Sequence, residues 1–176
     1  IVKADVIGRV APARQEEFTE KWEELEVQTG RNGFNDLFGH IRMIYAREKA
    51  KRALLEEFKE HVLSVVATPE DLIEKVLEPY ADSYLIAKSQ QYVSTKNAED
   101  VNRLLKWLNR IDNSDWLPPA ILFLSQKKDH PEYVLWFFTK LERLAAYLHI
   151  CAKNVNQRIE RYAEVIASLQ APHSKD

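Results

Sequence analysis

Apolar residues between Pro131 and Leu169 recur at the spacing of α-helices. In the first half of this stretch they form one stripe, made up of Val134, Phe137, Phe138, Leu141, Leu144, Ala145 and Leu148. A second stripe of mostly bulky side chains lies opposite, made up of Tyr133, Trp136, Lys140, Arg143 and Tyr147. A helix with bulky side chains on both faces is usually packed on both sides. The pattern therefore predicts a helix over residues 131–150 at the centre of a helical core.

The same periodicity predicts further helices on both sides of this stretch. They are expected over residues 3–10, 12–28, 34–45, 54–63, 69–78, 97–111, 117–124 and 154–169. Residues 49–52 form a basic, polar stretch that can interrupt the pattern. Helices joined by short loops make a bundle. We predict an all-α, bundle-like domain of about eight helices.

Helix ends are indicated by residues with special backbone or hydrogen-bonding properties. Thr29 and Gly30 are typical of a helix C-terminus, and Arg31, Asn32 and Gly33 then predict a turn. Pro79 falls inside a helical pattern, so we expect a kink or a break there. Three residues are expected to cap the following helix through their side chains: Thr68, Asn97 and Asn154.

Composition and charge exclude several classes of function. All four glycines lie in the first 39 residues, so residues 40–176 offer no glycine-rich phosphate loop. The 25 basic and 27 acidic residues leave a formal charge of -2, which argues against binding nucleic acid through bulk charge. No run of about 18 apolar residues is present, so no membrane span is expected.

Cysteine usage and the first residues bear on cellular context. The single Cys151 rules out an internal disulfide framework and a thiolate metal cluster, and suggests a cytoplasmic protein. The start at Ile1 has neither an initiator Met nor a secretory pattern, so we expect an excerpt of a longer protein. We treat residues 1–176 as a single helical domain, with N-terminal helices over 1–95 and C-terminal helices over 96–176.

The residues that most often carry chemistry form no recognisable site. His40, His61, His130, His149 and His173 are scattered, and no pair has the i, i+4 spacing of a helical metal site. Cys151 is expected to be a small buried hydrophobe. We therefore predict no catalytic residue, no metal site and no cofactor in this stretch of chain.

One alternative is enzymatic. Arg143 and His149 lie six residues apart, which resembles the Arg-x(4–6)-His site of HEPN-type helical ribonucleases. That resemblance implies that the pair would orient and protonate groups around a scissile phosphate. Six residues, however, place two side chains about 120° apart around an α-helix, and Leu144 stands where those sites usually carry a polar residue.

A binding surface is the second possibility. The basic and aromatic residues of the second stripe, with Lys140 and Arg143 at its centre, could meet phosphates and bases together with Arg158 and Arg161. The alternative is that Arg143 pairs with Glu160 or Glu164 while the aromatic residues pack against another element. We favour this alternative.

The segment Trp116-Leu117-Pro118-Pro119 also has two interpretations. An exposed aromatic-proline element can bind a partner protein. We favour a structural role, in which Trp116 anchors the entry to a helix and the prolines occupy its first turn.

Three runs of sequence suggest a family. LLKWLNRIDNSDWLPPAILFL and KLERLAAYLHICAKNVNQRIERYAEVI resemble the helical region of GmrSD-type modification-dependent restriction endonucleases, and FTEKWEELEVQTGRNGFNDLFGHIRMIY resembles the segment before it. The Asp-Gly-Gln-Gln-Arg motif of that family's N-terminal ParB/sulfiredoxin-like domain is absent here, and no His-centred HNH nuclease signature can be assembled. The resemblance therefore implies a non-catalytic middle domain that connects or positions other domains.

Our expectation is a cytoplasmic helical connector or interaction domain of a GmrSD-like DNA restriction protein, whose parent protein would be a nucleotide-dependent endonuclease. Its partners would be the flanking domains of the parent chain and, as a further possibility, DNA. The alternatives are a HEPN-like ribonuclease and a protein-binding helical adaptor unrelated to restriction.

Overall fold

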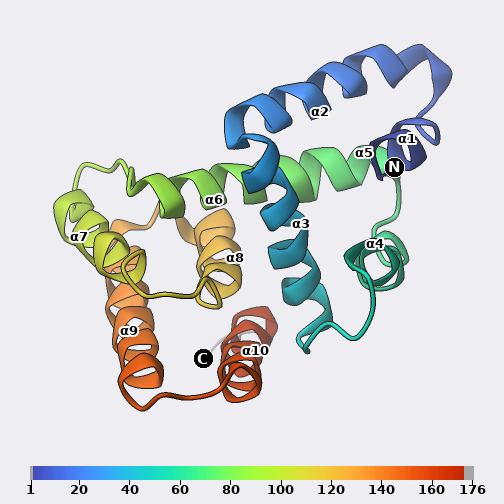
Figure 1. The fold of residues 1–176 in the computed structure, drawn as a ribbon. Coiled ribbons are helices and arrows are strands. Elements are labelled where there is room, and N and C mark those ends of the chain that lie inside the picture. The colour runs from blue at the N-terminus through green and yellow to red at the C-terminus, as the bar shows by residue number, and fades with distance from the viewer. Residues whose placement is uncertain (1, 173–176) are drawn as a thin grey trace. The chain divides into compact units, whose positions relative to one another are not determined.

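The computed structural model describes residues 2–172, and every regular element in that range is helical (Figure 1). Elements that follow one another without a break, such as α5, η3 and α6, form one helical run. Counted in this way, residues 2–172 contain nine helical runs, which confirms the predicted all-α class of about eight helices. None of these helices is both long and apolar enough to cross a membrane. The elements are α1 Val2–Ile7, η1 Pro12–Arg14, α2 Gln15–Thr29, α3 Arg31–Ala46, α4 Leu54–Phe58, η2 Lys59–Leu63, α5 Pro69–Asp71, η3 Leu72–Leu77, α6 Glu78–Ser89, α7 Ala98–Leu108, α8 Leu117–Lys127, α9 Pro131–Ile150 and α10 Val155–Gln170.

The first of two compact units comprises residues 2–46 and 50–82. In it α2 packs against α1, α3 and η3, while α3 also packs against α4 and η2. Its core is rich in aromatic side chains because α2, α3 and α4 each direct rings inward. The residues that are almost completely buried there include Phe18, Trp22, Leu37, Ile41 and Phe58.

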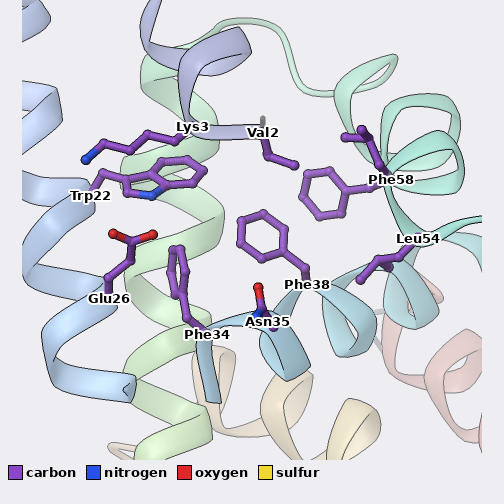
Figure 2. A pocket seen from close by; sticks show the side chains of 10 residues that line it. Val2, Lys3, Trp22, Glu26, Phe34, Asn35, Phe38, Leu54 and Phe58 are labelled. Carbon is purple, nitrogen blue, oxygen red and sulfur yellow. The ribbon is translucent and has the colours of Figure 1, made fainter. Parts of the chain in front are cut away.

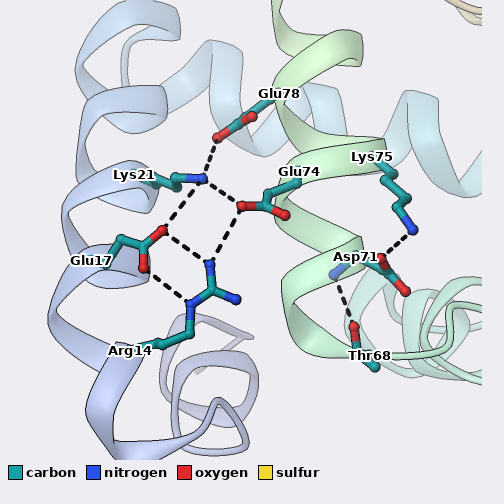
Figure 3. A network of polar contacts seen from close by, with 8 residues as sticks. All are labelled: Arg14, Glu17, Lys21, Thr68, Asp71, Glu74, Lys75 and Glu78. Carbon is teal, nitrogen blue, oxygen red and sulfur yellow. Dashed lines mark hydrogen bonds and ion pairs between the residues drawn. The ribbon is translucent and has the colours of Figure 1, made fainter.

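Charged side chains of this unit form a network of polar contacts (Figure 3). The Lys21 ammonium lies 2.7 Å from the Glu74 carboxylate and 3.7 Å from that of Glu78, which joins α2 to η3 and α6. Arg14 donates to Glu17 at 3.1 Å, and its guanidinium lies 4.6 Å from the centre of the buried Phe18 ring. Exposed ion pairs contribute little stability individually, so we expect this cluster to add little to the free energy of unfolding.

The second unit comprises residues 47–49 and 83–172. Within it α9 packs against α7 and α8, and α10 packs against α8. All eight residues from Leu117 to Leu124 of α8 are buried. Because α8 is apolar around its whole circumference, it is the helix that is enclosed on all sides. Both α9 and α10 pack against it.

Two of the three predicted side-chain caps are confirmed. The Thr68 hydroxyl accepts a hydrogen bond from the Asp71 backbone N–H at 3.0 Å. Asn154 forms a capping box with Gln157, in which each side chain accepts from the other residue's backbone N–H. The prediction for Asn97 is wrong: this residue adopts a left-handed backbone with φ 62°, and its side chain makes no capping bond.

The predicted turn over Arg31–Gly33 is also wrong. Gly30 alone reverses the chain, with φ 72° in the left-handed region that glycine adopts most easily. α3 begins directly afterwards at Arg31, and the Phe34 backbone N–H donates to the Gly30 carbonyl at 2.8 Å. One glycine therefore separates α2 from α3.

Pro79 does not end the helix, so the predicted break does not occur there. Helical backbone continues from Pro69 to Ser89, and the turn immediately before the proline is a π turn, Leu72–Leu77. In that turn the Glu78 N–H donates to the Ile73 carbonyl, five residues earlier. A regular α-helix would bring the proline ring against the carbonyl four residues before it. The wider π turn makes room for the ring.

Candidate contact surface on helix α9

One face of α9 is exposed although it carries large side chains. We define the α9 seam as Tyr133, Trp136, Lys140, Arg143, Tyr147 and Ile150, which follow one another at alternating spacings of three and four residues. The exposed fractions are 65% for Tyr133, 58% for Trp136, 56% for Tyr147 and 81% for Ile150. Lys140 and Arg143 are exposed as well. The opposite face is buried against α7 and α8, through Val134, Phe137, Phe138, Leu141, Ala145 and Leu148.

The prediction that α9 is packed on both sides is therefore wrong. The favoured pairing of Arg143 with Glu160 or Glu164 is wrong too, because α10 packs against α8 and Glu164 pairs with Arg161. Within residues 2–172, neither Lys140 nor Arg143 takes part in an ion pair. Two cations without an ionic partner among the described residues thus lie in the middle of the seam, with aromatic or aliphatic side chains at both ends.

The N-terminal end of the seam is hollowed. Glu132, Tyr133 and Trp136 line a shallow pocket at the surface. His130, one residue before the helix, packs its ring edge-to-face against Tyr133, with ring centres 6.2 Å apart. The Tyr133 ring is thereby held in place while most of it stays exposed, a geometry suited to receiving an apolar side chain.

Arg158, proposed from the sequence as a contact residue, is occupied within the fold. Its Nε donates to the Asp115 carboxylate at 2.7 Å, and one terminal nitrogen donates to the Lys153 carbonyl at 2.8 Å. Both side chains of the ion pair are about three-quarters buried. Burial raises the pKa of the neighbouring Tyr162 hydroxyl. Arg158 therefore fastens α10 to the loop before α8.

Arg161 is exposed, but its guanidinium pairs with Glu164 one turn further along α10. No hydrogen bond or ion pair among the described residues links Arg158 or Arg161 to Lys140 or Arg143. Of the four cations suggested by the sequence, two have no ionic partner within residues 2–172, and both lie on α9.

The ribonuclease pair is not assembled in this structure. The His149 ring lies 3.3 Å from the Asp112 carboxylate, which belongs to the loop between α7 and α8. No hydrogen bond joins Arg143 to His149 within residues 2–172. Across the same range, no group of three or more His, Cys, Asp and Glu side chains is placed to hold a metal ion.

Trp116 lies at the N-terminal end of α8 and is only 1% exposed. Pro118 and Pro119 follow in the first turn of that helix and are also buried. The segment is thus interior, and the interpretation as an exposed aromatic-proline ligand does not hold.

Cys151 is exposed, so the prediction that it would be a buried hydrophobe is wrong. His173 lies outside the described residues.

The sequence analysis did not include Ile150 in the stripe. Its position continues the alternating spacing of three and four residues, and that spacing could have identified it.

Comparisons with protein-family models, with curated proteins and with solved structures find no match to this chain. The resemblance to the GmrSD helical region therefore stays a prediction.

Proposed function

We propose that this chain is a non-catalytic, cytoplasmic interaction domain that docks a partner protein on the α9 seam. The GmrSD-like restriction system that the sequence resembles supplies the proposed setting, with a flanking domain of the parent chain as the partner. The observation that carries the proposal is the exposed seam itself, with its aromatic ends and unpaired central cations.

The composition of the seam favours a contact surface. Tyr, Trp and Arg are the residues most enriched at the centres of protein interfaces, and they carry most of the binding energy there. Side chains at alternating spacings of three and four residues form the narrow stripe by which one helix packs along another. A contiguous row of this kind is more than the scattered exposed apolar residues of an ordinary surface.

The charges favour a protein over a nucleic acid. The whole chain carries a formal charge of -2, and the seam has two cations that are unpaired in the described part of the chain, with Glu132 at its edge. A nucleic-acid surface normally gathers more positive charge, because each phosphate contact contributes through counterion release. Arg158 and Arg161, which would extend the positive surface, are engaged with carboxylates.

The order of side chains also disfavours a second copy of the chain as the partner. Lys140 and Arg143 occupy the middle of the seam, so two seams packed together, parallel or antiparallel, bring like charges opposite one another. A complementary partner has carboxylates in the middle and apolar side chains at both ends. We therefore propose an acidic amphipathic helix as the partner.

A synthetic amphipathic helix tests this directly. One peptide carries leucines at both ends of one face and two glutamates between them, and its twin carries two lysines instead. We expect the acidic peptide to bind about tenfold more tightly than the basic one, as measured by fluorescence anisotropy. The double change Lys140→Glu with Arg143→Glu should reverse this preference, whereas Lys106→Glu on the exposed side of α7 should leave it intact.

Other outcomes would contradict the proposal. Equal binding of both peptides would remove the role of the central cations. Duplex DNA that binds with steep salt dependence, and is lost on the double change, would instead identify a nucleic-acid surface. RNA cleavage that disappears in His149→Ala would select the ribonuclease alternative.

A further inference from the structure

The first unit contains a pocket of about 410 Å³ among α1, α2, α3 and α4 (Figure 2). Its apolar wall is a chain of aromatic rings in edge-to-face contact. The ring centres of Trp22 and Phe34 are 5.5 Å apart, those of Phe34 and Phe38 5.1 Å, and those of Phe38 and Phe58 4.8 Å. The volume lies near the lower end of the range found for pockets that bind small molecules.

Trp22 carries an unsatisfied polar group at this pocket. Its side chain is 1% exposed, and within the described residues its indole N–H has no hydrogen-bond partner. A buried donor without an acceptor costs free energy, and such groups are uncommon in native proteins. The Trp22 N–H is therefore a donor that still lacks an acceptor among the described residues.

A carboxylate stands next to it. Glu26 lies one turn further along α2, and Figure 2 shows its side chain beside Trp22 at the same side of the pocket. Glu26 is half-buried and forms no ion pair among residues 2–172. Lys3, on the pocket lining, is neutralised by Glu23 at 2.8 Å. The lining thus presents one uncompensated negative charge.

We propose that this pocket binds a small organic cation that carries a hydroxyl group on an apolar body. Its ammonium would pair with the Glu26 carboxylate, and its hydroxyl oxygen would accept the Trp22 N–H. The apolar body would lie against Phe34 and Phe38, where aromatic rings also attract a neighbouring cation. This assignment involves the first unit alone and does not depend on the α9 seam.

Three soluble probes with the same phenyl group separate these contributions. Phenylethanolamine carries both the ammonium and the hydroxyl, phenethylamine lacks the hydroxyl, and styrene glycol lacks the ammonium. We expect phenylethanolamine to bind best, about fivefold more tightly than phenethylamine and about tenfold more tightly than styrene glycol. Titrations of the whole chain, followed by ligand-observed NMR, give the three dissociation constants.

Substitutions identify the protein partner of each group. Trp22→Phe keeps an aromatic ring but removes the N–H, so it should abolish the preference for phenylethanolamine over phenethylamine. Glu26→Gln removes the charge and should abolish the preference over styrene glycol. Glu20→Gln makes the same chemical change at an exposed position of α2 outside the pocket, and should alter none of the constants.

The proposal is overturned if none of the probes shows saturable binding at millimolar concentrations. It is also overturned if styrene glycol binds as tightly as phenylethanolamine, or if Glu26→Gln retains the wild-type preference. Circular dichroism establishes that each variant is folded. Should Trp22→Phe fail to fold, Glu26→Gln and the comparison of charged with neutral probes still decide the outcome.

Discussion

Glu57 illustrates how one buried carboxylate organises the connection between α3 and α4. It is 2% exposed and accepts backbone N–H groups from Lys51 at 2.6 Å and from Arg52 at 2.8 Å. The buried Arg42 guanidinium of α3 pairs with it. The backbone donors, aided by Arg42, lower the pKa of Glu57 from 4.5 to about 2. Glu57 thus fixes the backbone of Lys51 and Arg52, which lie in the stretch that the sequence analysis described as basic and polar.

Acid should therefore destabilise the fold through this residue. In the unfolded chain Glu57 titrates near its ordinary pKa of 4.5, whereas in the folded chain it stays ionised down to about 2. Between those two values the unfolded state binds more protons, so the free energy of unfolding falls as the pH is lowered. Urea unfolding across this window measures the slope.

Glu57→Gln should lower stability at neutral pH and make the remaining pH dependence shallower. Glu56→Gln, at the exposed neighbouring position, is the matched control and should keep the wild-type slope. Asp5, Glu17 and Asp71, whose pKa values are lowered by hydrogen-bonded cations, contribute to the slope in both variants. An unchanged slope in Glu57→Gln would show that the carboxylate is not held as described.

At the level of elements, the sequence predicted helix positions well because both periodicity and caps are local signals. Thr68 and Asn154 cap as predicted, since such a cap needs only a side-chain oxygen and the next few backbone N–H groups. The turn predicted at Arg31–Gly33 and the break predicted at Pro79 are absent for a related reason. Whether a glycine or a proline ends a helix depends on how the adjoining turn relaxes, and residue type alone does not determine that.

The capping box at Asn154 gives a test at this scale. Asn154→Ala removes the acceptor for the Asn156 and Gln157 N–H groups, and should lower the free energy of unfolding by about 1 kcal/mol. Asn154→Asp retains an acceptor at the same place and should restore most of the loss. Denaturant titration of the three proteins is the measurement, and equal midpoints would mean that the cap does not stabilise α10.

For the whole molecule, the all-α class followed from the apolar periodicity, but which helix faces are covered did not. The bulky stripe of α9 was expected to be packed, and the structure leaves it exposed, while α8 is enclosed instead. A sequence pattern records which side chains share a face, yet it does not record whether another element lies over that face. The unpaired state of Lys140 and Arg143 became apparent only from where α10 packs.

Stability measurements can separate the two faces of α9. Trp136→Ser removes a largely exposed ring and should change the free energy of unfolding by no more than about 0.5 kcal/mol. Phe138→Ala, on the buried face, should cost about 3–5 kcal/mol through the cavity it creates. Losses of similar size in both variants would mean that the seam is covered within the chain itself.

The π turn before Pro79 has a consequence for chain length. A π turn holds one residue more than the α-helical turn that would join the same flanking segments. A chain shorter by one residue there could form a regular helix with its later side chains on the same faces. That helix would then press the Pro79 ring against the carbonyl of Lys75. The additional residue and the proline are therefore tied together: removing the residue alone would bring the ring against a backbone carbonyl, whereas removing it together with a Pro79→Ala substitution would not.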